Sequence, residues 1–226
     1  MLKNFYNFTK KLIKFLFYGR FDKFLKEIPN GGVIHVGANT AQERGHYKNL
    51  GVKYVIWIEA DPELFKIAKK NISKEDYENH LVLNYLVTDK NDNSYKFNIT
   101  NNGGNASSIF TLKKLDPGLQ YTKTIELKSK TLSEIVKIEN INLEKYQNLI
   151  IDAEGSEKLI LDGAKELFPY LKNIKLENGN VNFFKEENYN QEIHTYLKKF
   201  NFIEKKRTEI YKNSQGKLYD ILYSKI

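Results

Sequence analysis

Residues 33–43 read Val-Ile-His-Val-Gly-Ala-Asn-Thr-Ala-Gln-Glu, and this stretch decides how the chain folds. Four residues with strand propensity run into Gly37, and a polar segment that can start a helix follows. At the carboxyl edge of a parallel sheet, such a junction presents backbone N–H groups to a ligand, and only glycine leaves room for a close approach. The three spaced glycines of a dinucleotide site are absent, because positions 39 and 42 are Asn and Gln. The stretch therefore favours a cofactor without phosphates.

A second predicted strand, residues 54–58, ends at Glu59. A carboxylate at this strand end can accept hydrogen bonds from both ribose hydroxyls of a nucleoside. The alternative is that Glu59 supports the helix that begins at Pro62, but Asp61 can fill that role. The two strand ends together predict a nucleoside cofactor between them.

Strands and helices alternate along the chain from residue 31 onward. Strands separated by helices of this length predict right-handed βαβ units and a parallel sheet, and the last two strands predict a closing hairpin. The sequence thus predicts an α/β fold. The expected strands are residues 33–36, 54–58, 81–87, 94–100, 122–127, 148–151, 173–176, 202–205 and 218–223, and the expected helices are residues 42–50, 62–71, 131–138, 156–168 and 192–200.

Residues 101–108, Asn-Asn-Gly-Gly-Asn-Ala-Ser-Ser, interrupt this alternation. Such a segment cannot form regular structure and is long for an idle turn. Loops on a rigid scaffold often contact ligand. The alternative is a mobile connection that faces solvent.

The composition fits one globular domain with a short extension, since the chain has 226 residues of which 41% are hydrophobic. It contains no cysteine, which excludes disulfides, cysteine zinc sites and thiol nucleophiles. The net charge of +8 favours anionic partners, although interspersed acidic residues fit an ordinary solvated surface equally well. No segment is apolar enough over sufficient length to span a bilayer. Lys14 interrupts the short apolar run at residues 12–18 and no cleavage site follows, so we expect a cytoplasmic protein.

Residues 1–28 alternate lysine with aromatic and aliphatic residues at helical spacing. They predict an amphipathic helical extension, which precedes a domain at residues 29–226. One interpretation is a helix that lies on an anionic membrane or on a partner protein. The other is a helix that covers the domain core and keeps its lysines in water.

Carboxylates follow two further strands. The apolar strand 148–151 ends in Asp152 and Glu154, and the strand 173–176 ends in Glu177 and Asn178. These side chains can provide a general base, ligands for Mg²⁺, or an acidic partner for a cationic cofactor group. The alternative is that one carboxylate is solvated and the other caps the helix at Ser156. His35 lies within the first strand, where a hydrogen-bonded core residue is commoner than a catalyst.

Four motifs in this order resemble the FkbM family of S-adenosylmethionine-dependent methyltransferases. They are Val36-Gly37-Ala38-Asn39, Glu59-Ala60-Asp61-Pro62, the loop Asn105-Ala106-Ser107-Ser108, and Ile151-Asp152-Ala153-Glu154-Gly155 with Leu161-Asp162-Gly163-Ala164 after it. The resemblance implies a Rossmann-like, seven-stranded mixed sheet (class I methyltransferase) with helices on both faces and the last strand antiparallel.

The same resemblance implies site roles. The methionine side of S-adenosylmethionine would be lined by Gly37, Ala38 and Asn39, and the ribose would be held by Glu59 with Ala60. The adenine would be flanked by Leu86. The site would be closed by Ser107 and Ser108, and Asp152 would face the methyl-transfer centre. The family usually has Asp at position 35 and Gly at position 41, where this chain has His35 and Ala41. Asp152 or Glu154 would then take a larger share in binding the cofactor's ammonium group.

The resemblance also suggests O-methylation of a sugar, a sugar nucleotide or a surface-glycan precursor, as in capsule or lipopolysaccharide biosynthesis. Asp152 is the first candidate for the base, and Glu177 is the second, as a metal ligand or a substrate contact. The alternatives are an RNA methyltransferase and a non-catalytic scaffold that docks to a glycan-assembly enzyme or the inner membrane face through residues 1–28. We do not expect a nucleic-acid partner, because no basic patch interleaved with aromatics occurs beyond residue 28.

Overall fold

A run of buried apolar residues forms β1 (Gly32–Val36), the central strand of the protein. It pairs in parallel with β2 (Val55–Glu59) on one side and with β7 (Tyr146–Ile151) on the other. A strand without apolar/polar alternation requires cover on both faces of the sheet. The sequence of residues 33–36 therefore places this strand in the middle of a layered α/β fold.

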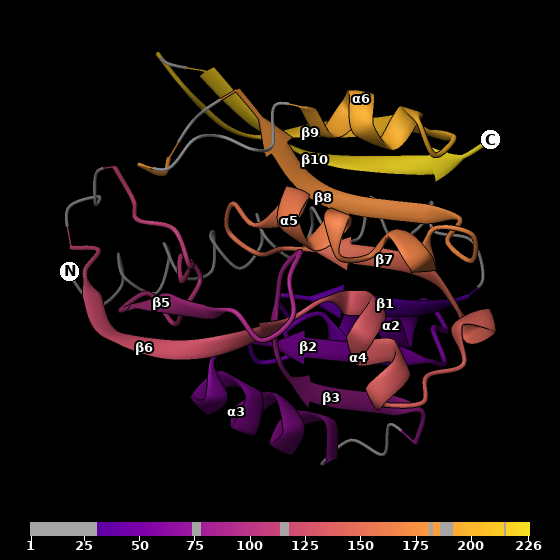
Figure 1. Ribbon diagram of the computed structural model, residues 1–226, viewed down its shortest axis with the longest axis horizontal. Helices are drawn as coiled ribbons and strands as arrows, with labels where there is room; N and C mark the ends of the chain where they lie inside the picture. Colours follow the sequence, from indigo (N-terminus) through magenta and orange to yellow (C-terminus); the bar gives the residue numbers. More distant parts are fainter. Residues whose placement is uncertain (1–30, 74–77, 114–117, 181–182, 186–191, 215) are drawn as a thin grey trace, which may run out of the picture.

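The structure is a computed structural model that describes residues 31–73, 78–113, 118–180, 183–185, 192–214 and 216–226. The extension predicted at residues 1–28 lies outside the described residues. The main sheet has seven strands in the order β3-β2-β1-β7-β8-β10-β9, and β10 runs antiparallel to both of its neighbours (Figure 1). This confirms the predicted Rossmann-like mixed sheet. The outer strands are β3 (His80–Asn84), β8 (Asn173–Gly179), β9 (Phe202–Asn213) and β10 (Gly216–Lys225).

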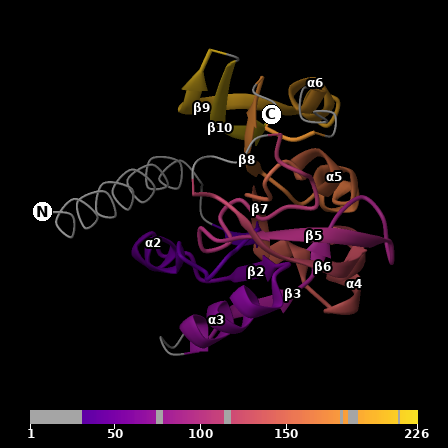
Figure 2. The same cartoon turned by 90° about the vertical axis from the view of Figure 1, so that its left-hand side faces the viewer.

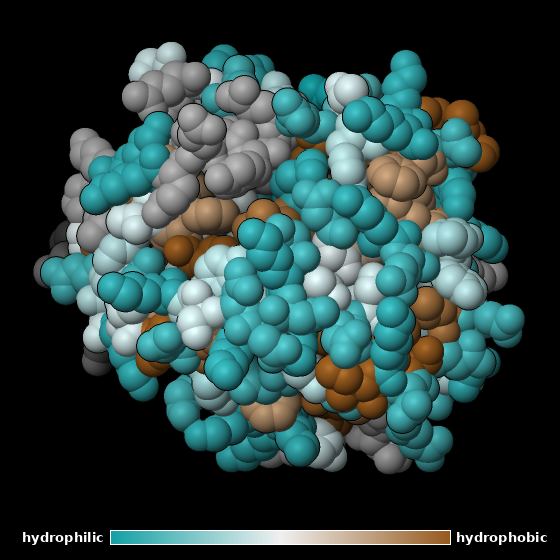
Figure 3. Space-filling view, viewed as in Figure 1, coloured by the Kyte–Doolittle hydropathy of each residue, from teal (hydrophilic) through white to brown (hydrophobic). Residues whose placement is uncertain are grey.

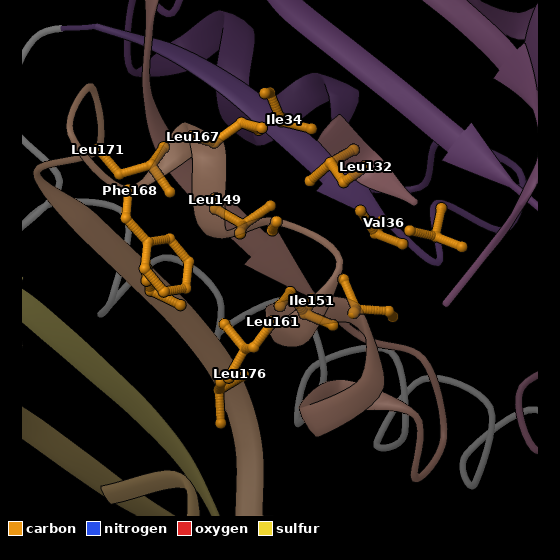
Figure 4. Packing of buried hydrophobic residues seen from close by; sticks show 14 of the residues in the cluster. Ile34, Val36, Leu132, Leu149, Ile151, Leu161, Leu167, Phe168, Leu171 and Leu176 are labelled. Carbon is orange, nitrogen blue, oxygen red and sulfur yellow. The ribbon is translucent and has the colours of Figure 1, made fainter. Parts of the chain in front are cut away.

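Helices cover both faces of the sheet, as predicted. Viewed along the sheet, α2 (Arg44–Asn49) and α3 (Pro62–Ser73) lie on one side, and α4 (Leu132–Ile138), α5 (Glu157–Asp162) and α6 (Ile193–Lys198) lie on the other (Figure 2). Because side chains alternate along a strand, β1 sends Val33 toward α2 and α3 and sends Ile34 and Val36 into the larger cluster beneath α4 and α5 (Figure 4).

A second sheet of three strands stands at the edge where the parallel strands end (Figure 1). It contains β4 (Leu86–Val87), β5 (Ser94–Thr100) and β6 (Tyr121–Lys130) in the order β4-β6-β5. The single strand predicted at residues 81–87 is wrong in this respect. The Asn84 side chain donates hydrogen bonds to the carbonyl oxygens of Glu59 and Ala60 at 2.7 and 3.1 Å, and after Tyr85 the chain leaves the main sheet to pair with β6.

Two other predicted boundaries differ from the structure. The helix predicted at residues 156–168 ends at Asp162, and a 3₁₀ turn, Lys165–Leu167, follows. Gly163 lies between them and packs closely, since a Cβ there would lie 2.2 Å from the carbonyl oxygen of Thr88. A second 3₁₀ turn, Leu143–Lys145, precedes β7. The closing hairpin is far longer than predicted, because β9 and β10 pair from residue 202 to residue 225.

The surface in the view of Figure 3 is mostly hydrophilic, with hydrophobic atoms in separate patches. One patch lies between the β5–β6 arm and the β9–β10 hairpin, at the edge where the parallel strands end. Among the described helices, none has the length and apolar character needed to cross a membrane.

We expect Gly37→Ala to destabilise the protein by at least about 3 kcal/mol, because several strain terms add. Gly37 has a φ of +82°, and a Cβ there would lie 1.7 Å from the carbonyl oxygen of Asp152. Urea unfolding monitored by circular dichroism measures the loss. Gly45→Ala is the matched control, since a Cβ added to Gly45 in α2 would have nothing within 4 Å of it. Similar midpoints for the two variants would contradict this role of Gly37.

Candidate active site

The carboxyl ends of β1, β2, β7 and β8 surround one cavity of about 880 Å³. This is near the upper end of the volumes that hold a small ligand, about 300–1,000 Å³. Of the site residues predicted from the sequence, all but Ser108 and Asn178 line it. The lining residues are Gly37, Ala38, Asn39, Glu59, Ala60, Leu86, Ser107, Asp152, Glu154 and Glu177. The structure therefore brings together residues from six separate segments, while their individual roles remain predictions.

Glu59 joins the turn after β1 to the end of β2. Its Oε2 accepts a hydrogen bond from the backbone N–H of Asn39 at 2.6 Å, and its Oε1 accepts one from that of Asp61 at 2.8 Å. Asp61 in turn accepts from the N–H of Glu63 at 2.8 Å and so caps α3, as the sequence suggested. A carboxylate has about four lone-pair sites, so Glu59 retains capacity for ribose hydroxyls. Burial raises its pKa to about 7.

The reason for glycine at position 37 differs from the one that the sequence suggested. The space that its Cβ would occupy belongs to the carbonyl oxygen of Asp152, not to a ligand. The turn continues with two left-handed residues, Asn39 at φ +48° and Ala41 at φ +56°. Position 41 is where glycine is expected, and a single left-handed alanine costs about 1–2 kcal/mol.

The loop at residues 101–108 is tied to the site on both sides. The Asn39 side-chain amide donates hydrogen bonds to the carbonyl oxygen of Gly103 at 3.0 Å and to Oδ1 of Asn105 at 3.1 Å. At the other end, the Ser108 hydroxyl donates to the carbonyl oxygen of Glu154 at 2.8 Å. The Ser107 hydroxyl is turned toward β5, where it accepts from the N–H of Thr100 at 3.1 Å. The loop thus closes one wall of the cavity instead of facing solvent freely.

The carboxylates after β7 and β8 lie in an environment that favours their protonated forms. Burial, followed by the negative charges of Asp152 and Glu157, raises the pKa of Glu154 well above its usual range. Burial and the nearby Asp152, Asp220 and Glu154 do the same for the pKa of Glu177. A carboxyl that holds its proton at neutral pH is a poor general base. Asp152 therefore stays the better candidate of the two residues predicted to be catalytic.

The predicted magnesium site gains no support. In the part of the chain that the structure describes, no group of three or more His, Cys, Asp or Glu side chains is arranged to hold a metal ion. Asp152 and Glu177 line the same cavity but form no such group.

Sequence reasoning missed three charged residues of the cavity, Glu43, Lys175 and Asp220. Lys175 Nζ lies 2.6 Å from Asp220 Oδ1, and their side chains are only 2% and 4% exposed. Lys175 stands between Ile174 and Leu176 in a buried strand, and a charge in an apolar run was the available signal. Burial and then Asp152 raise the pKa of Glu43 to about 7. Its place in the first turn after β1 gave no distinct signal.

His35 is a core residue and does not line the cavity. Its Nδ1 lies 3.0 Å from the Tyr47 hydroxyl, and its ring stacks on Trp57 with a centroid distance of 5.4 Å. Burial, with a smaller contribution from Lys175, lowers its pKa to about 3, so the imidazole is neutral. The residue that replaces the family's usual Asp thus carries no charge toward the site.

Comparison with solved structures places this fold among methyltransferases. TrmK of M. capricolum, in complex with S-adenosyl-homocysteine, shares 15% identity and a TM-score of 0.54 over 91% of this chain and 67% of that one. The tRNA methyltransferase TrmK of B. subtilis shares 12% identity and a TM-score of 0.50 over 88% and 63%. Sp1610 of Streptococcus pneumoniae, in complex with S-adenosyl-L-methionine, shares 10% identity and a TM-score of 0.50 over 91% and 72%. This chain thus spans about two thirds of their length, and such identities show the shared fold alone.

The seven-stranded sheet, with a cavity at its carboxyl edge, has the Rossmann-like architecture of these methyltransferases. The family model described as the methyltransferase FkbM domain matches residues 35–204. The chain therefore belongs to the FkbM methyltransferase family, as the four sequence motifs indicated. A comparison with curated proteins found no match.

We expect the free energy of unfolding of the ligand-free protein to fall as the pH rises from about 4.5 to about 7.5. In that window the folded state keeps protons on Glu43 and Glu59, whose pKa values are raised from 4.5 to about 7, while the unfolded chain releases them. Each group contributes about 2–3 kcal/mol to the fall. Urea unfolding at several pH values measures it, and Glu43→Gln should flatten the curve. Glu63→Gln, at an exposed position of α3, is the control. If the free energy of unfolding falls with pH as steeply in Glu43→Gln as in this control, the raised pKa of Glu43 is refuted.

Proposed function

We propose that this protein transfers a methyl group from S-adenosylmethionine to a hydroxyl of a sugar or glycan precursor. The observation that carries the proposal is that Asp152 lines one cavity together with Gly37 and Glu59, the residues proposed to hold the cofactor, and with further residues to which no cofactor role is assigned. We call the part of the cavity that these further residues line its outer half. Family membership supports the methyl transfer. The sugar-type acceptor is supported only by the resemblance of the motifs to this family.

The cavity suits the proposed cofactor in charge and in volume. S-adenosylmethionine, when bound, supplies an electrophilic methyl group on a sulfonium, and transfer leaves S-adenosylhomocysteine. Glu59 would accept hydrogen bonds from the ribose, Leu86 would pack on the adenine, and residues 37–39 would border the methionine. The carboxylates of Asp152 and Glu154 complement an ammonium and a sulfonium, because opposite charges attract strongly in a buried site.

Asp152 would receive the proton of the acceptor hydroxyl. An alcohol is a weak nucleophile at neutral pH, so alignment with the methyl group and removal of the proton must both be provided. The Asp152 N–H donates to the carbonyl oxygen of Val36 at 2.9 Å, which fixes this residue against β1. Glu177, which keeps its own proton, would orient the acceptor by hydrogen bonding.

RNA methylation is the second candidate, favoured by the net charge of +8 and by the tRNA methyltransferase that shares the fold. A third is a cofactor-binding scaffold in glycan assembly. We also propose a cytoplasmic location, and contact with a membrane or a partner enzyme through residues 1–28.

We expect Glu59→Gln to weaken binding of S-adenosylhomocysteine at least about tenfold, since a charged acceptor is replaced at a site with two fixed N–H donors. Isothermal titration calorimetry measures the affinity. Glu63→Gln is the matched control, because Glu63 is 73% exposed and pairs with Lys66 outside the cavity. Equal affinities in the two variants would remove Glu59 from the cofactor site.

We expect Asp152→Asn to lower the rate of methyl transfer about 100-fold or more, in line with the loss of a general base. The assay follows labelled methyl from S-adenosylmethionine into glycosides and cell-envelope extracts, with and without chelator. Asp162→Asn, whose carboxylate pairs with Lys158 and Lys165 on the α5 side, is the control. A variant that retains full activity would refute the role of Asp152, and loss of wild-type activity with chelator would restore the metal hypothesis.

A further inference from the structure

Two loops from distant parts of the chain meet across the outer half of the cavity. The backbone N–H of Lys113 donates to the carbonyl oxygen of Phe183 at 2.7 Å, and that of Lys185 donates to the carbonyl oxygen of Thr111 at 2.7 Å. Leu112 and Phe184 thereby form a short antiparallel bridge. The connection between β5 and β6 is thus fixed to the segment that follows β8.

This bridge places aromatic rings directly on the turn that holds the candidate base. A Cβ on Gly155 would lie 2.5 Å from Cε2 of Phe184 and 3.3 Å from Cδ2 of Phe110. The two rings contact each other, with centroids 5.8 Å apart. Gly155, with a φ of +97°, is therefore required both by the turn and by the closeness of Phe184.

The aromatic surface continues to the mouth of the cavity. Phe183 lies 5.2 Å from Tyr211, centroid to centroid, and Tyr211 is paired across the β9–β10 hairpin with Leu218. Tyr211 is 44% exposed, as expected of a residue at an entrance. We call Phe183, Phe184 and Tyr211, which line the cavity, the aromatic wall; Phe110 contacts Phe184 but does not line the cavity. None of its residues has a role in cofactor binding or proton transfer as described above.

The charges of the cavity limit what can lie against this wall. The described lining holds six carboxylates, Glu43, Glu59, Asp152, Glu154, Glu177 and Asp220, and one lysine, Lys175, which is paired with Asp220 at 2.6 Å. Proteins bind phosphate with arginine, lysine or clustered N–H donors. A phosphate at this lining would find Lys175 already paired with Asp220, and every carboxyl that is ionised would repel it.

We propose that the aromatic wall binds the acceptor, and that the acceptor is a hydroxylated ring compound with an apolar face and no phosphate near the reacting hydroxyl. The ring lies on Phe184 and Tyr211, which directs its hydroxyl toward Asp152. Aromatic side chains suit this role because each buries a large apolar area in a fixed geometry. This inference rests on the proposed O-methylation and narrows it, since it excludes sugar nucleotides whose pyrophosphate would lie in the cavity.

The test compares two fluorescent probes that share one aromatic ring, 4-methylumbelliferyl β-D-glucoside and 4-methylumbelliferyl phosphate. Each is titrated into the full-length protein saturated with S-adenosylhomocysteine. We expect the glucoside to bind at least tenfold more tightly than the phosphate. We also expect Tyr211→Ala and Phe184→Leu to weaken glucoside binding at least fivefold, and the control Tyr170→Ala, an exposed residue outside the cavity, to leave it unchanged.

Tighter binding of the phosphate, no binding of the glucoside, or equal affinities in wild type and both wall variants would overturn the proposal. Phe184→Leu keeps an apolar side chain on Gly155, and Tyr211 lies at the exposed mouth, so at least one variant should remain folded. Titration of S-adenosylhomocysteine into the same protein variants tests the proposed methyl transfer separately from the proposed acceptor site. If S-adenosylhomocysteine does not bind the wild-type protein but glucoside binding is still weakened by the wall variants, the proposed methyl transfer is wrong and the aromatic wall is still a binding site for the glucoside.

Discussion

The geometry of the site depends on one close contact between backbone atoms, where the end of β1 at Gly37 meets the end of β7 at Asp152. The carbonyl oxygen of Asp152 occupies the position that a Cβ of residue 37 would take, and the Asp152 N–H continues the β1–β7 ladder by bonding to Val36. The two strand ends are thereby held at a separation that only glycine allows. Asp152 stands at the centre of the carboxyl edge for this reason, and the turns that follow each strand diverge from it. One turn leads to Glu59 through Asn39, and the other leads to Gly155 and the aromatic wall.

This edge concentrates negative charge, and the fold accommodates it in two ways. Burial raises the pKa values of Glu43 and Glu59 to about 7 and raises those of Glu154 and Glu177 well above their usual range, so these carboxyls favour their protonated forms in the ligand-free protein. Lys175 meets Asp220 in a buried ion pair. A bound cation is stabilised in such a site, because the carboxyl groups can then ionise and pair with its positive charge. The sulfonium and ammonium groups of the proposed cofactor would therefore be stabilised in this cavity.

The sequence predicted the sheet and the carboxyl-edge residues because both follow from local pattern. The apolar runs at residues 33–36 and 148–151 can only be buried strands, and polar residues directly after them must lie at the shared edge of a parallel sheet. It did not predict Lys175 as a site residue, because its partner Asp220 is 45 positions away in the closing hairpin. It also missed the aromatic wall, because the contact of Phe183 with Tyr211 and that of Phe184 with Phe110 join segments far apart in the chain, and no periodicity encodes such contacts. Gly37 was predicted to be needed, but the reason lay in Asp152, a contact between segments that local pattern does not reveal.

The division between predicted and missed residues matches a division of roles within the cavity. Under the proposed function, the cofactor half is built mainly from turns that follow strands of the main sheet, and solved structures at 15% identity or less share this fold. The outer half is built from segments outside the strand–helix repeat, namely the β5–β6 connection, the stretch after β8 and the long β9–β10 hairpin. The first two segments are joined by the Leu112–Phe184 bridge and by ring contacts, and the hairpin is held by the pairing of β10 with β8 at the end of the main sheet. Acceptor choice can therefore change through these segments without disturbing the close approach at Gly37, which is why the fold alone does not define the acceptor.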